Sequence, residues 1–200
     1  LAAIAGSKQI IPTRMTFVDI AGLVRGASKG EGLGNQFLAN IRECDAIAHV
    51  LRCFEDGDIT HVEGRIDPVA DAETIETELM LADLDSVERR LTALGKKLRG
   101  GDQDTLDQDR LLRAAQAALA EGKPARTLKI AEEDRKQWRM LQLLTAKPVL
   151  YVCNVEEAKA ASGNSQSDRV AEMAAKQGAA SVVISARIEE ELAQLPEDEA

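Results

Sequence analysis

Apolar runs of strand length alternate with a helical pattern in the first quarter of the chain. Residues 15–18 and 46–51 are two such runs. Residues 35–43 lie between them and carry three apolar side chains at helical spacing, Phe37, Leu38 and Ile41. The alternation predicts a strand, a helix and a second strand in this order.

The last quarter of the chain repeats this alternation. Residues 148–153 and 181–184 form two further apolar runs, and a helix is expected over 165–177, with Ser167 or a neighbour as its cap. A shorter helix is expected over 132–144. Strands that alternate with helices favour an α/β fold with a parallel sheet covered on both faces.

The middle of the chain has a different period. Apolar residues recur there at spacings of four and three, which indicates a coiled-coil seam: Met80, Leu84, Val87, Leu91, Leu94 and Leu98. Gly100 and Gly101 interrupt the pattern, and a second helix over 106–120 carries its own stripe of Leu112, Ala115 and Leu119. Two helices joined by a short glycine turn predict an antiparallel hairpin.

This hairpin belongs either to a helical bundle or to an insertion in the sheet domain. The chain returns to alternating strands and helices after the hairpin, which favours the insertion. We therefore expect a sheet domain over 1–71 and 146–200, with an inserted helical domain over 72–145.

Composition limits the class of protein. The chain has 44% hydrophobic residues, enough for a core, and a net charge of −9, which argues against wrapping DNA by charge alone but allows a local basic patch. Its three cysteines fit no metal or disulfide pattern, and reduced thiols favour a cytoplasmic protein. No apolar run approaches the roughly 20 residues of a membrane span, so no membrane partner is expected.

The most informative motif follows the run at residues 15–18. Asp19 and Gly22 form an Asp-x-x-Gly sequence at the expected end of a strand. In P-loop nucleotidases an Asp in this place holds Mg²⁺ and the glycine N–H meets the γ-phosphate. Four residues alone are a weak signal, because Asp and Gly favour any strand-to-loop turn. The longer glycine-rich string over 19–35 is far more specific.

That longer string resembles the third nucleotide-binding motif and mobile switch of the Obg-like ATPases, the YchF subfamily of translation-factor-type GTPases. The resemblance covers residues 1 to about 195 and implies a P-loop NTPase-type doubly wound sheet with an inserted coiled-coil hairpin. It also implies ATP binding, Mg²⁺ at Asp19, slow hydrolysis and association with the ribosome, on its large subunit.

A second motif bears on base recognition. Asn154 follows the run at 148–153, where GTP-specific relatives carry Asn-Lys-x-Asp, but this chain has Val155 in the Lys position and Glu157 in the Asp position. The longer carboxylate shifts away from the guanine edge, and Val155 offers an apolar face to any purine. The resemblance implies that ATP is preferred to GTP, although Asn and Glu are also common in loops.

Two more segments are expected at the same edge of the sheet. Ser185 and Ala186 follow the last apolar run and resemble the motif whose backbone contacts the base. Ligands bind at the carboxyl ends of strands in doubly wound folds. Phe54 lies beyond the run at 46–51, where it either stacks on adenine or is a buried loop aromatic.

Catalysis requires a group that orients water. Leu23 occupies the position where Ras-type GTPases place Gln, and Leu has no polar group to orient the attacking water. His61 is the candidate for this role, against the simpler interpretation of a structural histidine. His49 lies within an apolar run and is expected in the core.

The family's phosphate-binding loop, Gly-x-x-x-x-Gly-Lys-Ser/Thr, does not occur in these 200 residues. Because the chain also begins at Leu1, we expect a fragment that lacks the P-loop and the C-terminal TGS domain, inactive alone although the intact protein is an ATPase. Two alternatives stay open: a non-catalytic module that docks a partner through the hairpin, and a GTPase with relaxed base choice.

Overall fold

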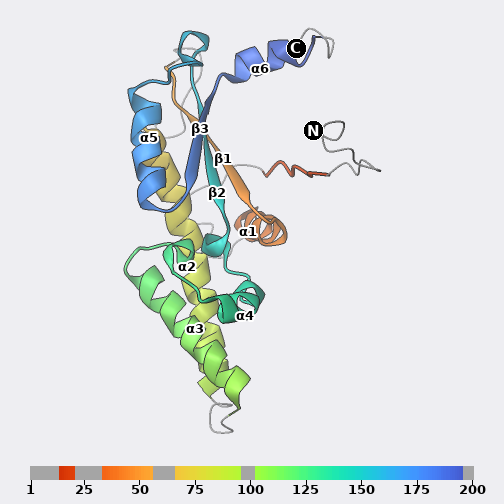
Figure 1. Cartoon of the computed structure of the whole chain (residues 1–200), viewed down its shortest axis with the longest axis vertical. Helices are drawn as coiled ribbons and strands as arrows, with labels where there is room; N and C mark the ends of the chain where they lie inside the picture. The colour runs from red at the N-terminus through yellow and green to blue at the C-terminus, as the bar shows by residue number, and fades with distance from the viewer. Residues whose placement is uncertain (1–13, 21–32, 56–65, 96–101, 196–200) are drawn as a thin grey trace, which may run out of the picture.

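The computed structural model describes residues 14–20, 33–55, 66–95 and 102–195. Three parallel strands form a sheet in the order β1-β2-β3, with β1 at Ile47–Arg52, β2 at Val149–Asn154 and β3 at Ala180–Ile184. Figure 1 shows this sheet at one end of an elongated molecule and a helical hairpin at the other. The expected α/β fold with a parallel sheet is confirmed.

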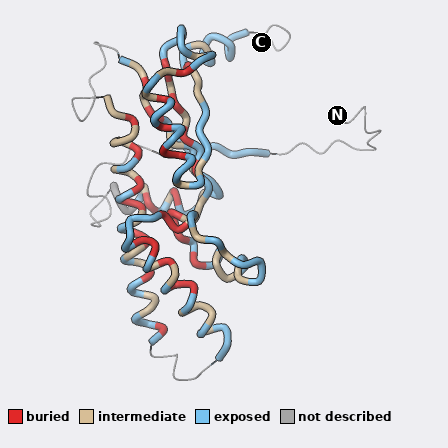
Figure 2. The backbone as a smooth tube through the Cα atoms, turned by 60° about the vertical axis from the view of Figure 1, so that its left-hand side comes forward, coloured by how far each residue is buried: buried red, intermediate tan, exposed pale blue. Residues whose placement is uncertain are grey.

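The two faces of the sheet differ in burial. One face carries Leu51, Tyr151 and Cys153, which are buried under helices α2 (Pro68–Gly95) and α5 (Ser165–Lys176). On the other face the side chains of Val50, Leu150 and Val182 are 63%, 39% and 39% exposed. Within the described residues, the core of the sheet domain therefore lies on one side of the strands, whereas the sequence predicted cover on both faces. Figure 2 marks the buried stretches of the chain in red.

Two shorter helices flank strands of this sheet in the sequence. Helix α1 (Leu33–Glu43) precedes β1 and buries Leu38 and Ile41, as its sequence pattern predicts. Helix α6 (Ala186–Leu192) follows β3.

Helix α5 begins with a capping box. The Asn164 side chain accepts hydrogen bonds from Gln166 N and Ser167 N, and the Ser167 hydroxyl accepts from Asn164 N at 2.8 Å. Asn164 is thus the cap, and Ser167 is its reciprocal partner.

Helices α2 and α3 (Gln103–Ala120) pack side by side as an antiparallel hairpin (Figure 1). Their contact buries residues of both predicted stripes: Val87, Leu94, Leu112, Ala115 and Leu119. Leu98 lies outside the described residues. With 28 residues, α2 is about 42 Å long, so it extends from the sheet into the hairpin. The expected boundary between the sheet domain and the helical domain, between residues 71 and 72, falls inside this helix.

The connection from α3 to β2 is less helical than expected. In place of one helix over 132–144 it has short helical turns: η3 (Ala125–Thr127), η4 (Glu132–Asp134), α4 (Arg135–Met140) and η5 (Leu144–Ala146). Leu141 and Leu143 both pack into the hairpin core, and residues two apart cannot share a helical face. Gln142 between them adopts φ 53°, which ends the helix.

The expected buried strand at 15–18 is wrong for this structure. Residues 14–20 form no strand, and the side chains of Met15, Phe17 and Val18 are 76%, 82% and 56% exposed. A strand needs a neighbour about 4.8 Å away, whereas Figure 1 shows this segment leading away from the sheet. Only Ile20 packs against a core cluster, the one that includes Leu38 and Ile41.

A buried carboxylate fixes the chain just before β2. Asp83, on α2, is 1% exposed. Its Oδ1 accepts from Leu144 N at 2.8 Å, and its Oδ2 accepts from Thr145 N at 2.8 Å and from the Thr145 hydroxyl at 2.7 Å. The pKa of Asp83 is raised, because the effect of burial outweighs that of these hydrogen bonds, which lower it. The three donors therefore offset part of the cost of burying the carboxylate.

A second buried network ties the hairpin to the sheet. Arg126 donates to both carboxylate oxygens of Glu76 at 2.9 and 3.0 Å, and both side chains are 6% exposed. Gln177 Oε1 accepts from Arg126 at 3.0 Å and from the Tyr151 hydroxyl at 3.1 Å. Residues of α2, the segment after α3, α5 and β2 therefore meet in one hydrogen-bonded group.

We expect Asp83→Ala to lower the free energy of unfolding by about 3 kcal/mol, because it leaves three buried donors without an acceptor. Urea denaturation measures the change. Asp85→Ala is the matched control, since Asp85 pairs with Arg89 at the surface and its side chain is 64% exposed. Equal effects of the two substitutions would show that the Asp83 contacts do not hold the fold.

Candidate functional site

The carboxyl ends of the three strands lie at one edge of the sheet, because the strands are parallel. The loop after β2 and the start of α6 lie at the upper end of the molecule in Figure 1. This edge holds Phe54, Asn154, Val155, Glu157, Ser185 and Ala186, which the sequence assigned to nucleotide binding.

Asn154 joins two of these loops. It is the last residue of β2, and its side-chain Oδ1 accepts a hydrogen bond from Ala186 N at 2.9 Å. Backbone bonds continue on either side: Val155 N donates to Ile184 O at 2.9 Å, and Cys53 N donates to Asn154 O at 2.8 Å. The ends of all three strands are therefore held in register at the point where the loops begin.

Glu157 and the residue after Ala186 form an ion pair across the same loops. Arg187 Nε lies 2.8 Å from Glu157 Oε1, and the two side chains are 74% and 49% exposed. Glu157 begins the short turn η6 (Glu157–Lys159), whose backbone bonds include Ala160 N to Glu157 O at 3.1 Å. The carboxylate proposed for base recognition thus has a cationic partner.

Val155 was expected to offer its side chain to a purine at the strand edge, but its side chain points into the core. Its side chain is 2% exposed and belongs to the core cluster under the sheet, together with Leu51 and Cys153. An apolar face for a purine is therefore not available at Val155 in this structure. The buried position explains an apolar residue here without reference to a ligand.

Phe54 is partly buried beside Arg52. The Arg52 guanidinium carbon lies 4.8 Å from the centre of the Phe54 ring, and Arg52 Nε donates to Phe54 O at 3.1 Å. Asn164 Nδ2 donates to Cys53 O at 2.7 Å, so the cap of α5 holds the chain directly before Phe54. The guanidinium covers one face of the ring. The geometry is therefore compatible with stacking of Phe54 on a base and also with a structural role.

Two groups beneath these loops, Cys53 and His49, are held in their neutral forms. The interaction with the Cys153 thiol, followed by burial, raises the pKa of the Cys53 thiol. Burial lowers the pKa of His49 to about 4, and its ring lies 5.8 Å from that of Tyr151. Both groups are therefore neutral near pH 7. His49 lies in β1 and is half-buried, outside the core clusters in which it was expected.

The other predicted site residues differ in their outcome. Asp19 is exposed on segment 14–20, which leads away from the sheet in Figure 1. Ser185 lies at the edge, but its side chain is 3% exposed. Gly22, Leu23 and His61 lie outside the described residues. Among the residues that the structure describes, no group of three or more His, Cys, Asp or Glu could hold a metal.

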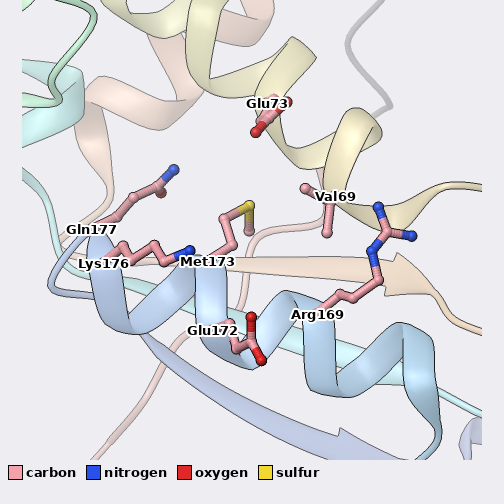
Figure 3. A pocket seen from close by; sticks show the side chains of 7 residues that line it. All are labelled: Val69, Glu73, Arg169, Glu172, Met173, Lys176 and Gln177. Carbon is pink, nitrogen blue, oxygen red and sulfur yellow. The ribbon is translucent and has the colours of Figure 1, made fainter.

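A hollow of about 300 Å³ lies elsewhere, between the first turns of α2 and the side of α5 that faces them (Figure 3). None of the site residues that the sequence predicted lines this hollow. Its lining mixes acidic and basic side chains: Val69, Glu73, Arg169, Glu172, Met173, Lys176 and Gln177. The opposed charges and open shape give no preference for an anionic nucleotide.

Sequence reasoning missed two polar partners at the strand edge. Arg187 could have been noticed as a cation directly after Ser185–Ala186, but sequence gives no sign that it reaches Glu157. From the sequence, Asn164 is recognisable only as a possible helix cap. Its contact with Cys53 O could not be foreseen, because the two residues are 111 positions apart.

Within the described ranges, no helix combines the length and apolar character needed to cross a membrane.

Comparison with known proteins gives consistent matches. A family model described as "50S ribosome-binding GTPase" matches residues 4–84. The chain is 46% identical over 201 residues to the "Ribosome-binding ATPase YchF" of Bacillus subtilis and 49% identical over 199 residues to that of Haemophilus influenzae. Both alignments include the whole chain, which spans about half of these curated relatives, 55% and 54%.

A solved structure matches as well. The chain superposes on the Schizosaccharomyces pombe YchF GTPase with a TM-score of 0.79 and 33% sequence identity. The match covers 99% of this chain and 55% of that one.

We expect Asn154→Leu to expose the Ala186 amide, because the substitution removes the acceptor of its hydrogen bond. Hydrogen exchange monitored by NMR would show loss of protection at Ala186 while the amide of Val152 in β2 stays protected. The isosteric Asn154→Asp keeps an acceptor oxygen and should retain the protection. Unchanged exchange in Asn154→Leu would contradict the proposed connection between the two loops.

Proposed function

Because the chain belongs to the YchF family of Obg-like nucleotidases, as its similarity over its whole length shows, we propose that it forms part of an ATP-binding, slowly ATP-hydrolysing protein that binds the ribosome. The relatives are named for ATP hydrolysis and ribosome binding. The activity and partners of the whole protein are proposals, since the chain spans about half of those relatives.

One observation carries the nucleotide proposal. The hydrogen bond from Ala186 N to Asn154 Oδ1 brings the two loops assigned to base recognition together at the carboxyl edge of the sheet. Ligands of doubly wound folds bind at this edge. In this proposal Glu157 faces the base, the backbone of Ser185 and Ala186 contacts it, and Phe54 stacks on it.

GTPases of this class generally use Mg²⁺, and we propose that Asp19 would hold it. Asp19 is an exposed carboxylate. Its oxygen donors suit Mg²⁺, which proteins bind through one or two carboxylates together with substrate phosphates. Bound Mg²⁺ would neutralise charge on the β- and γ-phosphates. The backbone N–H of Gly22 is proposed to meet the γ-phosphate.

We propose His61 as the group that orients the attacking water, because Leu23 cannot do so. A structural histidine is the alternative. We also propose the division into a sheet domain over 1–71 and 146–200 and a helical domain over 72–145.

Charge supports the hairpin side as the surface that meets the ribosome, on its large subunit. The range 72–145 carries 13 Lys and Arg against 14 Asp and Glu, whereas the rest of the chain carries 12 against 20. Lys129, Lys136 and Arg139 are exposed there, with no recorded ion pair in the described part of the chain. Cations free of partners are the groups that bind RNA phosphates. With a ribosomal partner, the proposed location of the protein is the cytoplasm.

We expect the full-length protein to release phosphate from Mg·ATP and Asp19→Asn to slow this release at least about tenfold, because the amide is a poorer ligand for Mg²⁺. Asp45→Asn is the control, since Asp45 is also exposed. The 200-residue chain alone should release none, because it has no Gly-x-x-x-x-Gly-Lys-Ser/Thr sequence. Unchanged turnover in Asp19→Asn would exclude Asp19 as the metal ligand.

Base preference is expected to depend on Glu157. Glu157→Asp in the full-length protein should raise the affinity for GTP relative to ATP, roughly fivefold for each guanine hydrogen bond gained at about 1 kcal/mol. Isothermal titration with both nucleotides measures the ratio. Val155 is left unchanged because it is buried. An unaltered ratio would remove Glu157 from base recognition, and tighter GTP than ATP binding in the wild type would identify a GTPase.

A further inference from the structure

The ion pair between Glu157 and Arg187 is too exposed to be important for folding. The side chains are 49% and 74% exposed, and pairs of this kind contribute at most about 1 kcal/mol. The pair nevertheless determines which atoms of Glu157 can accept another hydrogen bond. Oε1 is occupied by Arg187 Nε at 2.8 Å, and Oε2 has no recorded partner among the described residues.

The backbone holds both partners in place. Glu157 begins η6, three residues after the end of β2, and Arg187 is in the first turn of α6, directly after Ala186. Asn154 Oδ1 accepts from Ala186 N and so fixes the distance between the two loops. The pair therefore sits on a rigid frame, although its own side chains are exposed.

The two purines present different atoms to such a pair. Guanine offers two neighbouring donors, N1–H and the N2 amine, which match both oxygens of a free carboxylate. Adenine offers one donor, the N6 amine, beside an acceptor, N1, which a carboxylate repels. A carboxylate with one oxygen engaged, next to a guanidinium with spare N–H groups, provides one acceptor and one donor.

We propose that Arg187 is a positioning residue for Glu157 that determines base specificity, by occupying one carboxylate oxygen and presenting a donor beside it, so that adenine is favoured over guanine. The inference rests on the proposed function, because it requires that a nucleotide base binds at this edge. It adds a residue of α6 to the base-recognition motif, outside Asn154–Glu157 and Ser185–Ala186.

The test compares ATP and GTP affinities of the full-length wild type, Arg187→Ala and Arg187→Lys by isothermal titration. We expect Arg187→Ala to reduce the preference for ATP by about fivefold to tenfold, as expected for one charge-assisted hydrogen bond. Arg187→Lys keeps a cationic donor and should restore most of the preference. Thermal unfolding should be nearly unchanged in both variants, because the pair is exposed.

Lys159→Ala is the matched control, because Lys159 is an exposed cation of the same loop with no recorded ion pair among the described residues. An unaltered ATP-to-GTP ratio in Arg187→Ala, or an equal change in Lys159→Ala, would overturn the role of Arg187 and leave nucleotide binding standing. A wild type that binds neither nucleotide would overturn the proposed function together with this inference.

Discussion

The position of the central strand depends on one buried carboxylate. The chain leaves the sheet after β1, and 96 residues separate Arg52 from Val149, where it returns to pair with β1. Asp83 holds the returning chain four residues before β2 begins. A carboxylate removed from water is costly unless donors surround it, and Leu144 N, Thr145 N and the Thr145 hydroxyl supply them. Because Asn154 ends the same strand, the geometry of the candidate site follows from this anchor.

The site combines a rigid frame with adjustable side chains. Backbone bonds and the Asn154 amide lock the three strand ends together, whereas Glu157, Arg187 and Arg52 interact at the surface. A rigid frame positions groups without loss of conformational entropy on binding, and exposed pairs exchange partners at small cost. A rigid backbone frame with exposed side-chain pairs suits a site whose ligand replaces the contacts between those side chains.

Regular periodicity made most of the fold predictable. The stripes at Val87 and Leu112 and the apolar runs of β1, β2 and β3 were located from spacing, because each has one buried partner surface. Spacing failed near Leu141 and Leu143, where burial of residues two apart overrides the helical pattern. It also failed at residues 15–18, which are exposed and pair with none of the strands that the structure describes. At the site, sequence located Asn154 and Ala186 but misplaced Val155, since motif position does not reveal burial.

The most direct test of this account is a titration of the full-length protein with Mg·ATP, followed residue by residue through backbone amide resonances. We expect the largest shifts at Phe54, Glu157 and Ala186, with little change along α3 or around the hollow between α2 and α5. Shifts concentrated at that hollow, or at α3, would place the ligand elsewhere and contradict the assignment of the strand edge as the nucleotide site.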